Sequence, residues 1–475
     1  MNANEDIFIS SADIHWLSKD QAWHYRILPF KKQGHLLSLY CEECAPADLS
    51  EELEILLGLE IKLTPLPVED IGRLLSKYYI KDNAVQGQSQ FQINTSDDFL
   101  INLIGEAKNL KSSDIHIESY ENKCRVRIRI DGMMVERYLL KKAEYPALIN
   151  KIKILSNLDI AEKRLPQDGR INFKLHNQQF DIRVSVLPTL FGEKIVLRLL
   201  NNDAADIDLN RLGFSDFDLE NYLQGIKKPN GILLISGPTG SGKTTTLYAT
   251  LKLLNKETRN ILTIEDPVEY TLEGVNQVQL KEAIGLNFAA ALRTFLRQDP
   301  DIIMVGEIRD PETANMAVRA ALTGHLVLST IHTNSAWGIV SRLIDMGIPP
   351  FLVASTLNTT VAQRLLRLLC PACKEESDFN DSLYPRQFKP YSVVSTHFIA
   401  RGCERCHYTG YKGRKAVYEV IPIDQDLTLE IKNSNMNVLK LLKDKGIQTI
   451  AENAFKLFDQ GLTTIDEIYP LLLNY

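Results

Sequence analysis

The strongest chemical signal in the sequence is a glycine-rich stretch that ends in a lysine and threonines. It consists of Gly237, Pro238, Thr239, Gly240, Ser241, Gly242, Lys243 and Thr244, followed by Thr245. This order fits the phosphate-binding pattern G-x-x-x-x-G-K-[ST] at every fixed position. Glycines let backbone N–H groups close around phosphates, the lysine reaches the β- and γ-phosphates, and Thr244 can ligate Mg²⁺. We therefore expect this loop to bind ATP with Mg²⁺.

Carboxylates and a histidine follow the later apolar runs of the chain. They are Glu265, Asp266 and Glu269 after NILTI, Glu307 after IIMVG, and His332 after HLVLSTI. The carboxyl ends of strands line the ligand crevice of an open α/β sheet. We expect Glu307 to orient water, Glu265 and Asp266 to hold the metal's outer shell, and His332 to donate to the γ-phosphate. Each residue alone is more simply a helix cap, a surface charge or a core histidine, but their repetition at strand ends favours a site.

Two pairs of cysteines have the spacing of a metal site. Cys370 and Cys373 form one C-x-x-C turn, and Cys403 and Cys406 form a second. Two such turns can clasp one tetrahedral Zn²⁺, and four cysteine ligands leave no open position on the metal. We therefore predict a structural zinc site, with unmetallated thiols as the alternative.

Four sequence blocks occur in one order along the C-terminal half of the chain. They are the loop at 237–244, ILTIEDPVEY at 261–270, LRQDPDIIMVGEIRD at 296–310 and TGHLVLSTIHTN at 323–334. They resemble the Walker A, Asp box, Walker B and His box of the secretion ATPase superfamily, which drives type II secretion and type IV pilus assembly. The resemblance covers roughly residues 90–475, and it departs from the family after Asn334, where an aspartate commonly follows.

The resemblance implies a fold and an assembly. The fold is α/β: a RecA-like P-loop domain with a mostly parallel sheet, preceded by a PAS-like α+β domain and a small N-terminal α/β module. The assembly is a homo-hexamer, with nucleotide held between two domains of each subunit. A tetracysteine zinc element is typical of the members that assemble pili rather than retract them.

The resemblance also implies roles for individual residues. Arginines of the second domain reach the ATP, and RLPQDGRI and DIRVSVLP match those segments, so the candidates are Arg170 and Arg183. A planar guanidinium pairs with phosphate oxygens in two places, although ordinary surface ion pairs are the alternative. Glu307 and Lys243 become the catalytic pair, with Glu265 and His332 in support. His325 belongs to the His box, and Arg293, Arg297 and Arg309 occupy family arginine positions without an assigned role.

The elements that must position these residues follow from hydrophobic periodicity. Short apolar runs such as GILLIS, NILTIE, DIIMVG and HLVLSTIH alternate with helical stretches, which indicates a mostly parallel sheet covered by helices. Before them, strands with a period of two (KCRVRIRIDG, GRINFKLHNQQFDIRVSVLP, GEKIVLRLL) favour an antiparallel sheet after a helix at 98–110. The first 80 residues contain a helical stretch at 48–61.

These patterns predict the domain organisation. We expect an N-terminal partner-docking module, a polar linker, a second N-terminal domain, and an ATPase domain with a tetracysteine insert at 370–406. Their predicted ranges are 1–80, 81–97, 98–205 and 206–475. An inner-membrane platform protein of the secretion or pilus apparatus is the partner expected for residues 1–80.

Composition limits the alternatives. Lysine and arginine number 54 against 60 acidic residues, a net charge of −6, which argues against direct nucleic-acid binding. No apolar run approaches the ~18 residues that span a bilayer, and the N-terminus lacks a signal pattern. We expect a cytoplasmic protein, peripheral at the inner membrane through its partner, in which Cys41 and Cys44 are incidental. A DNA-uptake or DNA-translocating ring ATPase and a nucleotide-gated scaffold with little turnover are the other hypotheses.

Overall fold

The computed structural model describes residues 16–17, 19–46, 48–78, 96–175, 178–199 and 208–473. The chain forms two compact units, Met1–Ile171 with Val184–Arg198, and Asn172–Arg183 with Leu199–Tyr475. Almost all of the expected linker at 81–97 lies outside the described residues. The domain boundaries expected from the sequence stay a prediction.

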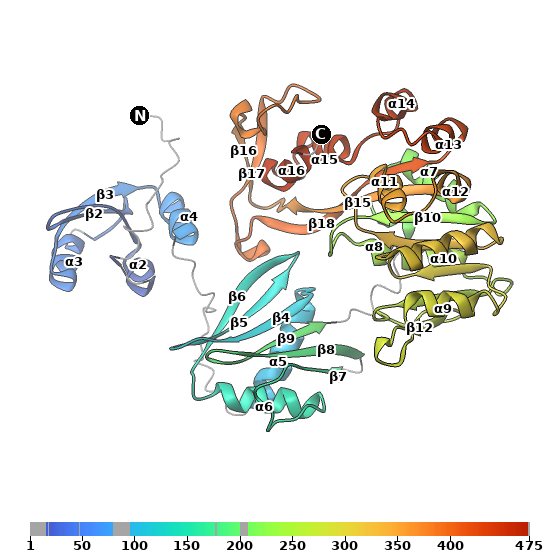
Figure 1. Ribbon diagram of the computed structural model, residues 1–475. Coiled ribbons are helices and arrows are strands. Elements are labelled where there is room, and N and C mark those ends of the chain that lie inside the picture. The colour runs from blue at the N-terminus through green and yellow to red at the C-terminus, as the bar shows by residue number, and fades with distance from the viewer. Residues whose placement is uncertain are drawn as a thin grey trace. The chain divides into compact units, whose positions relative to one another are not determined.

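The first unit begins with a small α/β layer. Its elements are α2 (Lys19–Tyr25), β1 (Ile27–Gln33), β2 (Leu36–Glu42), α3 (Leu49–Leu57), β3 (Glu60–Leu66) and α4 (Val68–Tyr78). The strands lie in the order β1-β2-β3, with β1 antiparallel and β3 parallel to β2 (Figure 1). Since parallel neighbours need a crossover, α3 makes that connection.

The helix expected over residues 48–61 is wrong in its last part. The helix α3 ends at Leu57 because Gly58 adopts a left-handed conformation, with φ of 63°. The N–H of Gly58 donates to the Glu54 carbonyl at 2.9 Å, which closes the helix. The residues after Gly58 form β3 instead, with Ile61 buried.

A second, six-stranded sheet follows. Its elements are α5 (Ser96–Asn109), β4 (Asp114–Ser119), β5 (Cys124–Ile130), β6 (Met133–Leu140), α6 (Tyr145–Leu155), β7 (Gln167–Leu175), β8 (Gln178–Thr189) and β9 (Gly192–Leu199). The strand order is β6-β5-β4-β9-β8-β7, and β4 pairs antiparallel with both β5 and β9. These pairings confirm the antiparallel arrangement predicted for β5 and β9, and α5 confirms the helix expected at 98–110.

The two faces of this sheet differ in character. Val126 and Ile128 of β5 are fully buried, whereas the alternating Arg125 and Arg127 surround Glu118 on the other face. Burial opposes ionisation of Glu118, but hydrogen bonds from Arg127, Lys194 and Arg125 prevail and lower the pKa of its carboxyl to about 2. Period-two alternation thus places an ionic network on one face and the hydrophobic core on the other.

The second unit is built on a seven-stranded sheet in the order β12-β11-β13-β14-β10-β15-β18. Its first elements are α7 (Asp216–Lys227), β10 (Gly231–Ser236), α8 (Lys243–Leu254), β11 (Ile261–Glu265), β12 (Asn276–Gln279), α9 (Phe288–Phe295), β13 (Ile302–Val305), α10 (Pro311–Leu322), β14 (Leu326–Ile331), α11 (Gly338–Asp345), α12 (Pro350–Thr356) and β15 (Leu357–Leu369). All neighbouring strands are parallel except β15 and β18 (Tyr411–Pro422), which confirms the predicted mostly parallel sheet.

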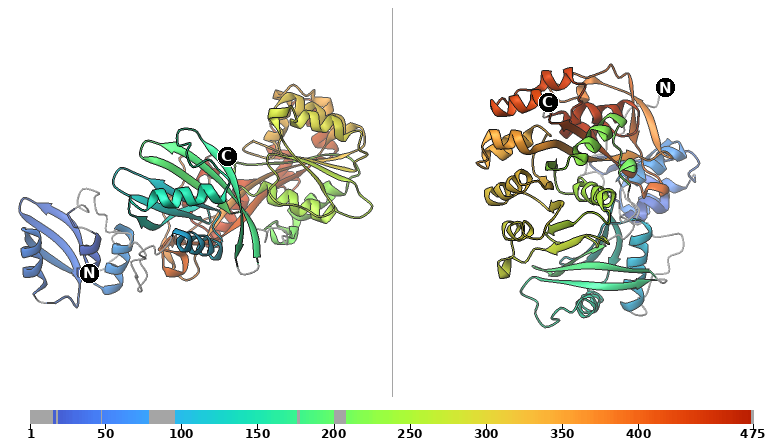
Figure 2. Two further views of the ribbon diagram at one scale, coloured as in Figure 1. Left: turned by 90° about the horizontal axis from the view of Figure 1, so that it is seen from below. Right: turned by 90° about the vertical axis from the view of Figure 1, so that its right-hand side faces the viewer.

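Helices cover both faces of this sheet, and β10 shows why. Ile232 and Leu234 belong to one hydrophobic cluster, whereas Leu233 and Ile235 belong to the other. The first cluster includes residues of α9 and α10, and the second includes residues of α7 and α8, so the strands pass between two helical layers (Figure 2). Fully burying each such side chain contributes about 1.5–3 kcal/mol, which explains the uninterrupted apolar runs.

The C-terminal part of the second unit adds a hairpin and a helical group. The hairpin is β16 (Lys374–Asp378) with β17 (Thr396–Ala400), and the helices are α13 (Gln425–Lys432), α14 (Leu439–Asp444), α15 (Ile450–Asp459) and α16 (Ile465–Leu472). Over the part of the chain that the structure describes, no helix is long and apolar enough to cross a membrane.

Candidate nucleotide site and metal centre

The glycine-rich loop connects β10 to α8 at the centre of the sheet. Gly237, Gly240 and Gly242 have φ of 154°, 82° and 89°, values that residues with a Cβ rarely adopt. A Cβ on Gly242 would also lie 2.8 Å from the Gln363 amide nitrogen, and one on Gly237 would overlap the Gln363 carbonyl oxygen. Glycine at these two positions therefore satisfies both backbone conformation and close packing, as the sequence pattern requires.

Lys243 begins α8 and lies within the loop. Its ammonium donates to the carbonyl of Gly237 at 2.8 Å and to that of Pro238 at 3.0 Å. Burial lowers the pKa of Lys243, while the negative charge of Glu307 opposes this shift. The lysine and the carboxylate are thus electrostatic neighbours, although they are far apart in sequence. The side chain of Thr244, the predicted magnesium ligand, is exposed and Thr245 is half-buried.

Glu307 follows β13, and His332 follows the neighbouring β14. The Glu307 carboxylate lies 2.5 Å from the Arg309 guanidinium and 3.5 Å from Nε2 of His332. Only 14% of the Glu307 side chain is exposed, against 50% of His332. Parallel strand ends therefore bring Lys243, Glu307 and His332 to one edge of the sheet. Such a cluster can hold a phosphate, neutralise it and orient a water molecule.

Glu265, at the end of β11, is embedded in a hydrogen-bond network. Its carboxylate accepts bonds from the Thr263 hydroxyl at 2.6 Å, the Gln277 amide at 3.2 Å and the Tyr248 hydroxyl. Burial raises the pKa of the Glu265 carboxyl, and these donors act in the opposite direction. Glu265 is only 4% exposed, whereas its neighbour Asp266 is exposed at the sheet edge. Their catalytic and metal roles stay predictions.

The two predicted arginines lie in different surroundings. Arg183 on β8 belongs to the second unit, where it lies 3.2 Å from the Glu269 carboxylate and donates to the Val268 carbonyl at 2.6 Å. It therefore contacts the acidic box directly. Arg170 on β7 is exposed. The contact of both arginines with ATP stays a prediction.

His325, Arg293 and Arg297 of the family blocks have local partners. His325 precedes β14, at the opposite end of the strand from His332, and its ring bonds to the Ala320 carbonyl at 2.8 Å. Arg293 on α9 pairs with Glu312 at 2.6 Å, and Arg297 donates to the Arg293 carbonyl at 3.1 Å. These contacts assign no role in nucleotide binding to His325, Arg293 or Arg297.

The four predicted metal ligands converge. The sulfur atoms of Cys370, Cys373, Cys403 and Cys406 all lie within 4.8 Å of one another. The sulfur separations are 3.9 Å for Cys370 and Cys403, 3.7 Å for Cys373 and Cys406, and 3.8 Å for Cys403 and Cys406. Four thiolates about 2.3 Å from a tetrahedral Zn²⁺ stand about 3.8 Å apart, so the cluster fits this ion.

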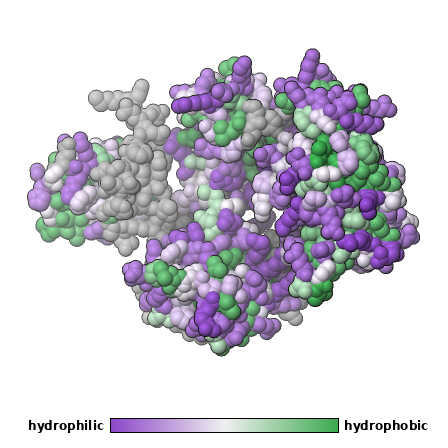
Figure 3. Space-filling view, in the orientation of Figure 1, coloured by the Kyte–Doolittle hydropathy of each residue, from purple (hydrophilic) through white to green (hydrophobic). Residues whose placement is uncertain are grey.

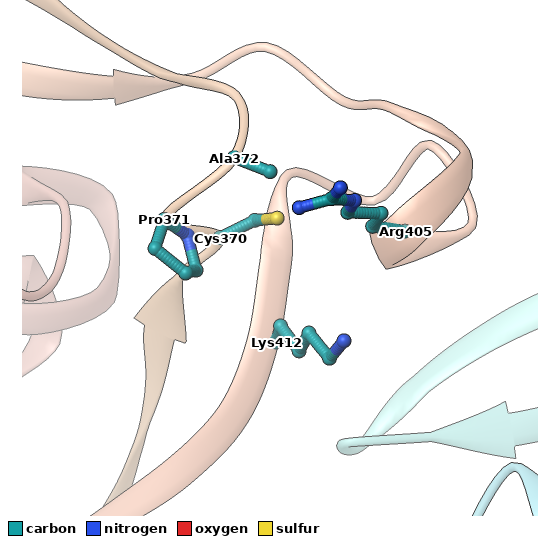
Figure 4. A pocket seen from close by; sticks show the side chains of 5 residues that line it. All are labelled: Cys370, Pro371, Ala372, Arg405 and Lys412. Atoms are coloured by element: carbon teal, nitrogen blue, oxygen red, sulfur yellow. The ribbon is translucent and has the colours of Figure 1, made fainter.

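A shallow pocket of about 180 Å³ opens beside the cluster (Figure 4). Cys370, Pro371, Ala372, Arg405 and Lys412 line it. The Cys370 side chain and the Arg405 guanidinium point toward one another in this view. A cation at this place would offset the negative charge that four thiolates carry around a bound divalent ion.

The family model described as type II/IV secretion system protein matches residues 93–470. The chain belongs to this family of secretion ATPases. It is 45% identical over 407 residues to the type II secretion system protein E of Pseudomonas aeruginosa, covering 84% of this chain and 80% of that one. It is 42% identical over 495 residues to the type IV pilus assembly ATPase PilB of Myxococcus xanthus, covering 98% and 87%.

Two solved structures, an ATPase and a pilus retraction motor, have the same fold. The Legionella pneumophila ATPase DotB matches with a TM-score of 0.61 at 21% identity, over 80% of this chain and 96% of that one. The pilus retraction motor PilT, solved with bound ADP, matches with a TM-score of 0.54 at 26% identity, over 78% and 96%. These matches confirm the predicted RecA-like P-loop fold.

The structure places three further residues of this secretion ATPase at the site. Gln363 packs on the loop glycines, and its amide oxygen accepts the Thr246 hydroxyl at 2.9 Å. Arg364 lowers the pKa of Lys243 through its charge and donates to the Asn334 carbonyl at 2.9 Å. Tyr248 binds Glu265. No sequence pattern indicates the first two, because β15 follows the loop by more than a hundred residues, although it lies beside β10.

Proposed function

We propose that this chain is a Mg²⁺-dependent ATPase that works as a homo-hexamer and drives assembly of a type II secretion pseudopilus or a type IV pilus at the inner membrane. The observation that carries the proposal is the glycine loop 237–244, which holds the Lys243 ammonium and lies at the sheet edge where Glu307 and His332 are 3.5 Å apart. Relatives named for type II secretion and for pilus assembly support the motor role. The ADP held by the similar PilT supports a nucleotide at this fold.

Each residue of the site has a defined task in this proposal. The backbone of residues 237–244 would hold the phosphates, Lys243 would neutralise their charge, Thr244 would ligate the metal, and Asp266 would belong to the metal's outer shell. Hydroxyl and carboxylate oxygens are the donors that Mg²⁺ prefers, so the residues present fit this ion. When bound, Mg²⁺ supplies positive charge to the phosphates. Glu307 orients the attacking water, and His332 hydrogen-bonds toward the γ-phosphate.

In this proposal Arg170 and Arg183, which belong to the predicted second N-terminal domain (98–205), contact the nucleotide. Arg183 already reaches the acidic box through Glu269, and Arg170 lies on the adjacent strand. A guanidinium pairs with phosphate oxygens through two parallel bonds, so these two groups favour a closed arrangement while triphosphate is present. Loss of phosphate removes that preference and permits a hinge motion, which a ring of subunits converts into work.

The four cysteines hold a structural Zn²⁺ in this proposal. Their sulfur separations match a tetrahedral thiolate site, and all four ligand positions are filled by protein. The ion fixes the two turns that flank the β16–β17 hairpin. It takes no part in hydrolysis.

Residues 1–80 dock an inner-membrane platform protein. The outer side of α3 exposes Ile55 by 87% and Leu56 by 47%. Figure 3 shows hydrophobic surface gathered over this end of the first sheet layer. Apolar side chains that face solvent together give a partner protein a contact surface. The chain works on the cytoplasmic side and reaches the membrane through this partner, without direct nucleic-acid binding.

Hydrolysis by the full chain tests the proposed activity. We expect the wild-type chain to release phosphate from Mg·ATP. The variant Lys243→Ala should reduce the rate at least about 100-fold, because Lys243 is the only positively charged side chain among residues 237–244. The matched control is Lys252→Ala, in the last turn of α8, which keeps wild-type turnover. Equal turnover by wild type and Lys243→Ala contradicts the proposal, and circular dichroism verifies that the variant is folded.

A further inference from the structure

Glu419 on β18 is a buried carboxylate with two backbone partners from distant parts of the chain. The residue is 3% exposed, and its oxygens accept the N–H of Ala336 at 3.1 Å and the N–H of Ile450 at 3.1 Å. A buried carboxylate is costly unless it is hydrogen-bonded, and bonds to an ionised group are the stronger ones. The side chain therefore ties two separate segments to each other.

The first segment follows His332 of the candidate site. Ala336 is fully buried, four positions after the histidine whose Nε2 lies 3.5 Å from Glu307. The segment is also fixed by Arg364, which donates to the Asn334 carbonyl at 2.9 Å. A shift of residues 333–336 would move His332 relative to Glu307. The bond from Ala336 to Glu419 opposes such a shift.

The second segment is the first turn of α15. Its N-terminus is already capped, because the Thr449 hydroxyl accepts the Glu452 N–H at 3.2 Å and the Glu452 carboxylate accepts the Thr449 N–H at 2.7 Å. This box leaves the N–H of Ile450, the first residue of the helix, for Glu419. Capping alone does not explain why the same carboxylate also binds Ala336.

The helix α15 is packed against the hairpin that the cysteines flank. Phe458 lies 5.5 Å from Phe379 and 6.2 Å from His397, ring centre to ring centre. Phe455 lies 6.2 Å from Tyr384 in a stacked arrangement. Contacts between packed aromatic rings transmit displacement because protein interiors are close-packed.

We propose that Glu419 is a positioning residue for ATP hydrolysis. It holds the segment after His332 so that the histidine stays against Glu307, and it links this segment to α15 and thereby to the cysteine-flanked hairpin. The inference rests on the proposed ATPase function. It assigns no contact between Glu419 and the nucleotide.

The variant Glu419→Gln tests the inference with almost no change of shape. Glutamine keeps one oxygen acceptor, but its NH₂ group then faces a backbone donor, so one of the two bonds is lost. We expect kcat to fall about tenfold while the KM for ATP stays within about twofold, since the phosphate loop is untouched. Glu220→Gln, the same substitution at an exposed position of α7, keeps wild-type values.

A double-mutant cycle shows whether Glu419 acts through the histidine. If it does, Glu419→Gln lowers kcat less than about twofold in a His332→Ala background. An equal tenfold loss in both backgrounds overturns the proposal, as does an unchanged kcat in Glu419→Gln alone. Failure of the proposed function is a different result, because Lys243→Ala then hydrolyses ATP as fast as wild type.

If Glu419→Gln does not fold, hydrogen exchange measured on the wild-type chain tests the inference instead. Exchange is compared between Mg·ADP and Mg²⁺ with a non-hydrolysable ATP analogue. The proposal predicts that amides of residues 333–337 and of residues 449–453 change protection together, each by at least about twofold. A change confined to residues 333–337, or no change in either segment, overturns the coupling.

Discussion

Glu307 and Lys243 are the side chains on which the proposed hydrolysis depends. Strands β13 and β10 deliver them to the same edge of the sheet, and the pKa of Lys243 responds to the charge of Glu307. In the proposal Lys243 binds the phosphate oxygens that the loop holds, whereas Glu307 orients the attacking water. Removing each residue should therefore have a different kinetic signature.

The variant Glu307→Gln should still bind Mg·ATP but hydrolyse it roughly 100-fold to 10,000-fold more slowly. The neutral amide lacks the negative charge with which the carboxylate would act on the attacking water. Fluorescent-nucleotide binding and phosphate release measured on the same preparation check this. Glu312→Gln, at a position 62% exposed on α10, is the control. Loss of ATP binding in Glu307→Gln would assign the residue to nucleotide affinity instead.

Glu265 leads to a pH-dependent prediction. Because burial raises its pKa, the folded chain binds this proton more tightly than the unfolded chain. The carboxyl thus contributes stability that is fully present below the unfolded pKa and is lost as pH rises through the folded pKa. The variant Glu265→Gln has no carboxyl at this position, so it does not lose stability with pH in this way.

The free energy of unfolding of wild type minus that of Glu265→Gln should therefore fall as pH rises above 4.5, the ordinary pKa of a glutamic acid. Urea unfolding at several pH values measures it, with Glu220→Gln as the control whose difference stays constant. A difference that grows with pH would mean that the ionised form is the one the network stabilises.

The site residues that can be predicted from the sequence are those whose types and spacing match a known chemical motif. The glycines, Lys243, Glu307 and the four cysteines belong to spaced patterns, and the structure brings each set together. Gln363 and Glu419 belong to no such pattern, because each acts through a packing contact or backbone bond that only the tertiary fold creates. Their types and spacing alone carry no such information.

At the scale of elements, the cysteine turns hold the ends of the β16–β17 hairpin. Cys370 and Cys373 precede β16, while Cys403 and Cys406 follow β17. The hairpin packs through Phe379 and His397 on α15. A Zn²⁺ bound at the turns, as proposed, would therefore stabilise both the hairpin and its contact with the C-terminal helices.

The variant Cys403→Ser should release zinc, because a hydroxyl is a poor ligand for this ion, and should lower the melting temperature by several degrees. Metal analysis of purified protein should give about one zinc per wild-type chain and almost none in the variant. Cys44→Ser, at an exposed cysteine outside the cluster, should retain the metal. Wild-type protein without zinc would end this account of the cysteines.

Apolar periodicity predicts the elements of the nucleotide unit well. Buried parallel strands are continuous apolar runs, and β10, β11, β13 and β14 each match one. The helix expected at 48–61 is too long by several residues, because one left-handed glycine ends α3. From the sequence we predict no strand at β4 or β6: DIHIES alternates polar and apolar residues with a period of two but spans only six residues, whereas MMVERYLL shows no alternation.

At the scale of the whole molecule, the chain combines a nucleotide unit with N-terminal layers that have their own cores. The first sheet layer has a separate hydrophobic cluster, which includes Leu28, Leu39 and Leu53. The partner docking proposed for residues 1–80 would use this layer.

The proposed function depends on the loop at 237–244 holding the triphosphate. The most direct measurement is a crystal structure of the full chain with Mg²⁺ and a non-hydrolysable ATP analogue. We expect phosphate density over Gly237–Thr244, with Lys243 on the terminal phosphates, the metal on Thr244 and Glu307 facing the γ-phosphate. Density for the analogue at any other place, with this loop empty, would contradict it.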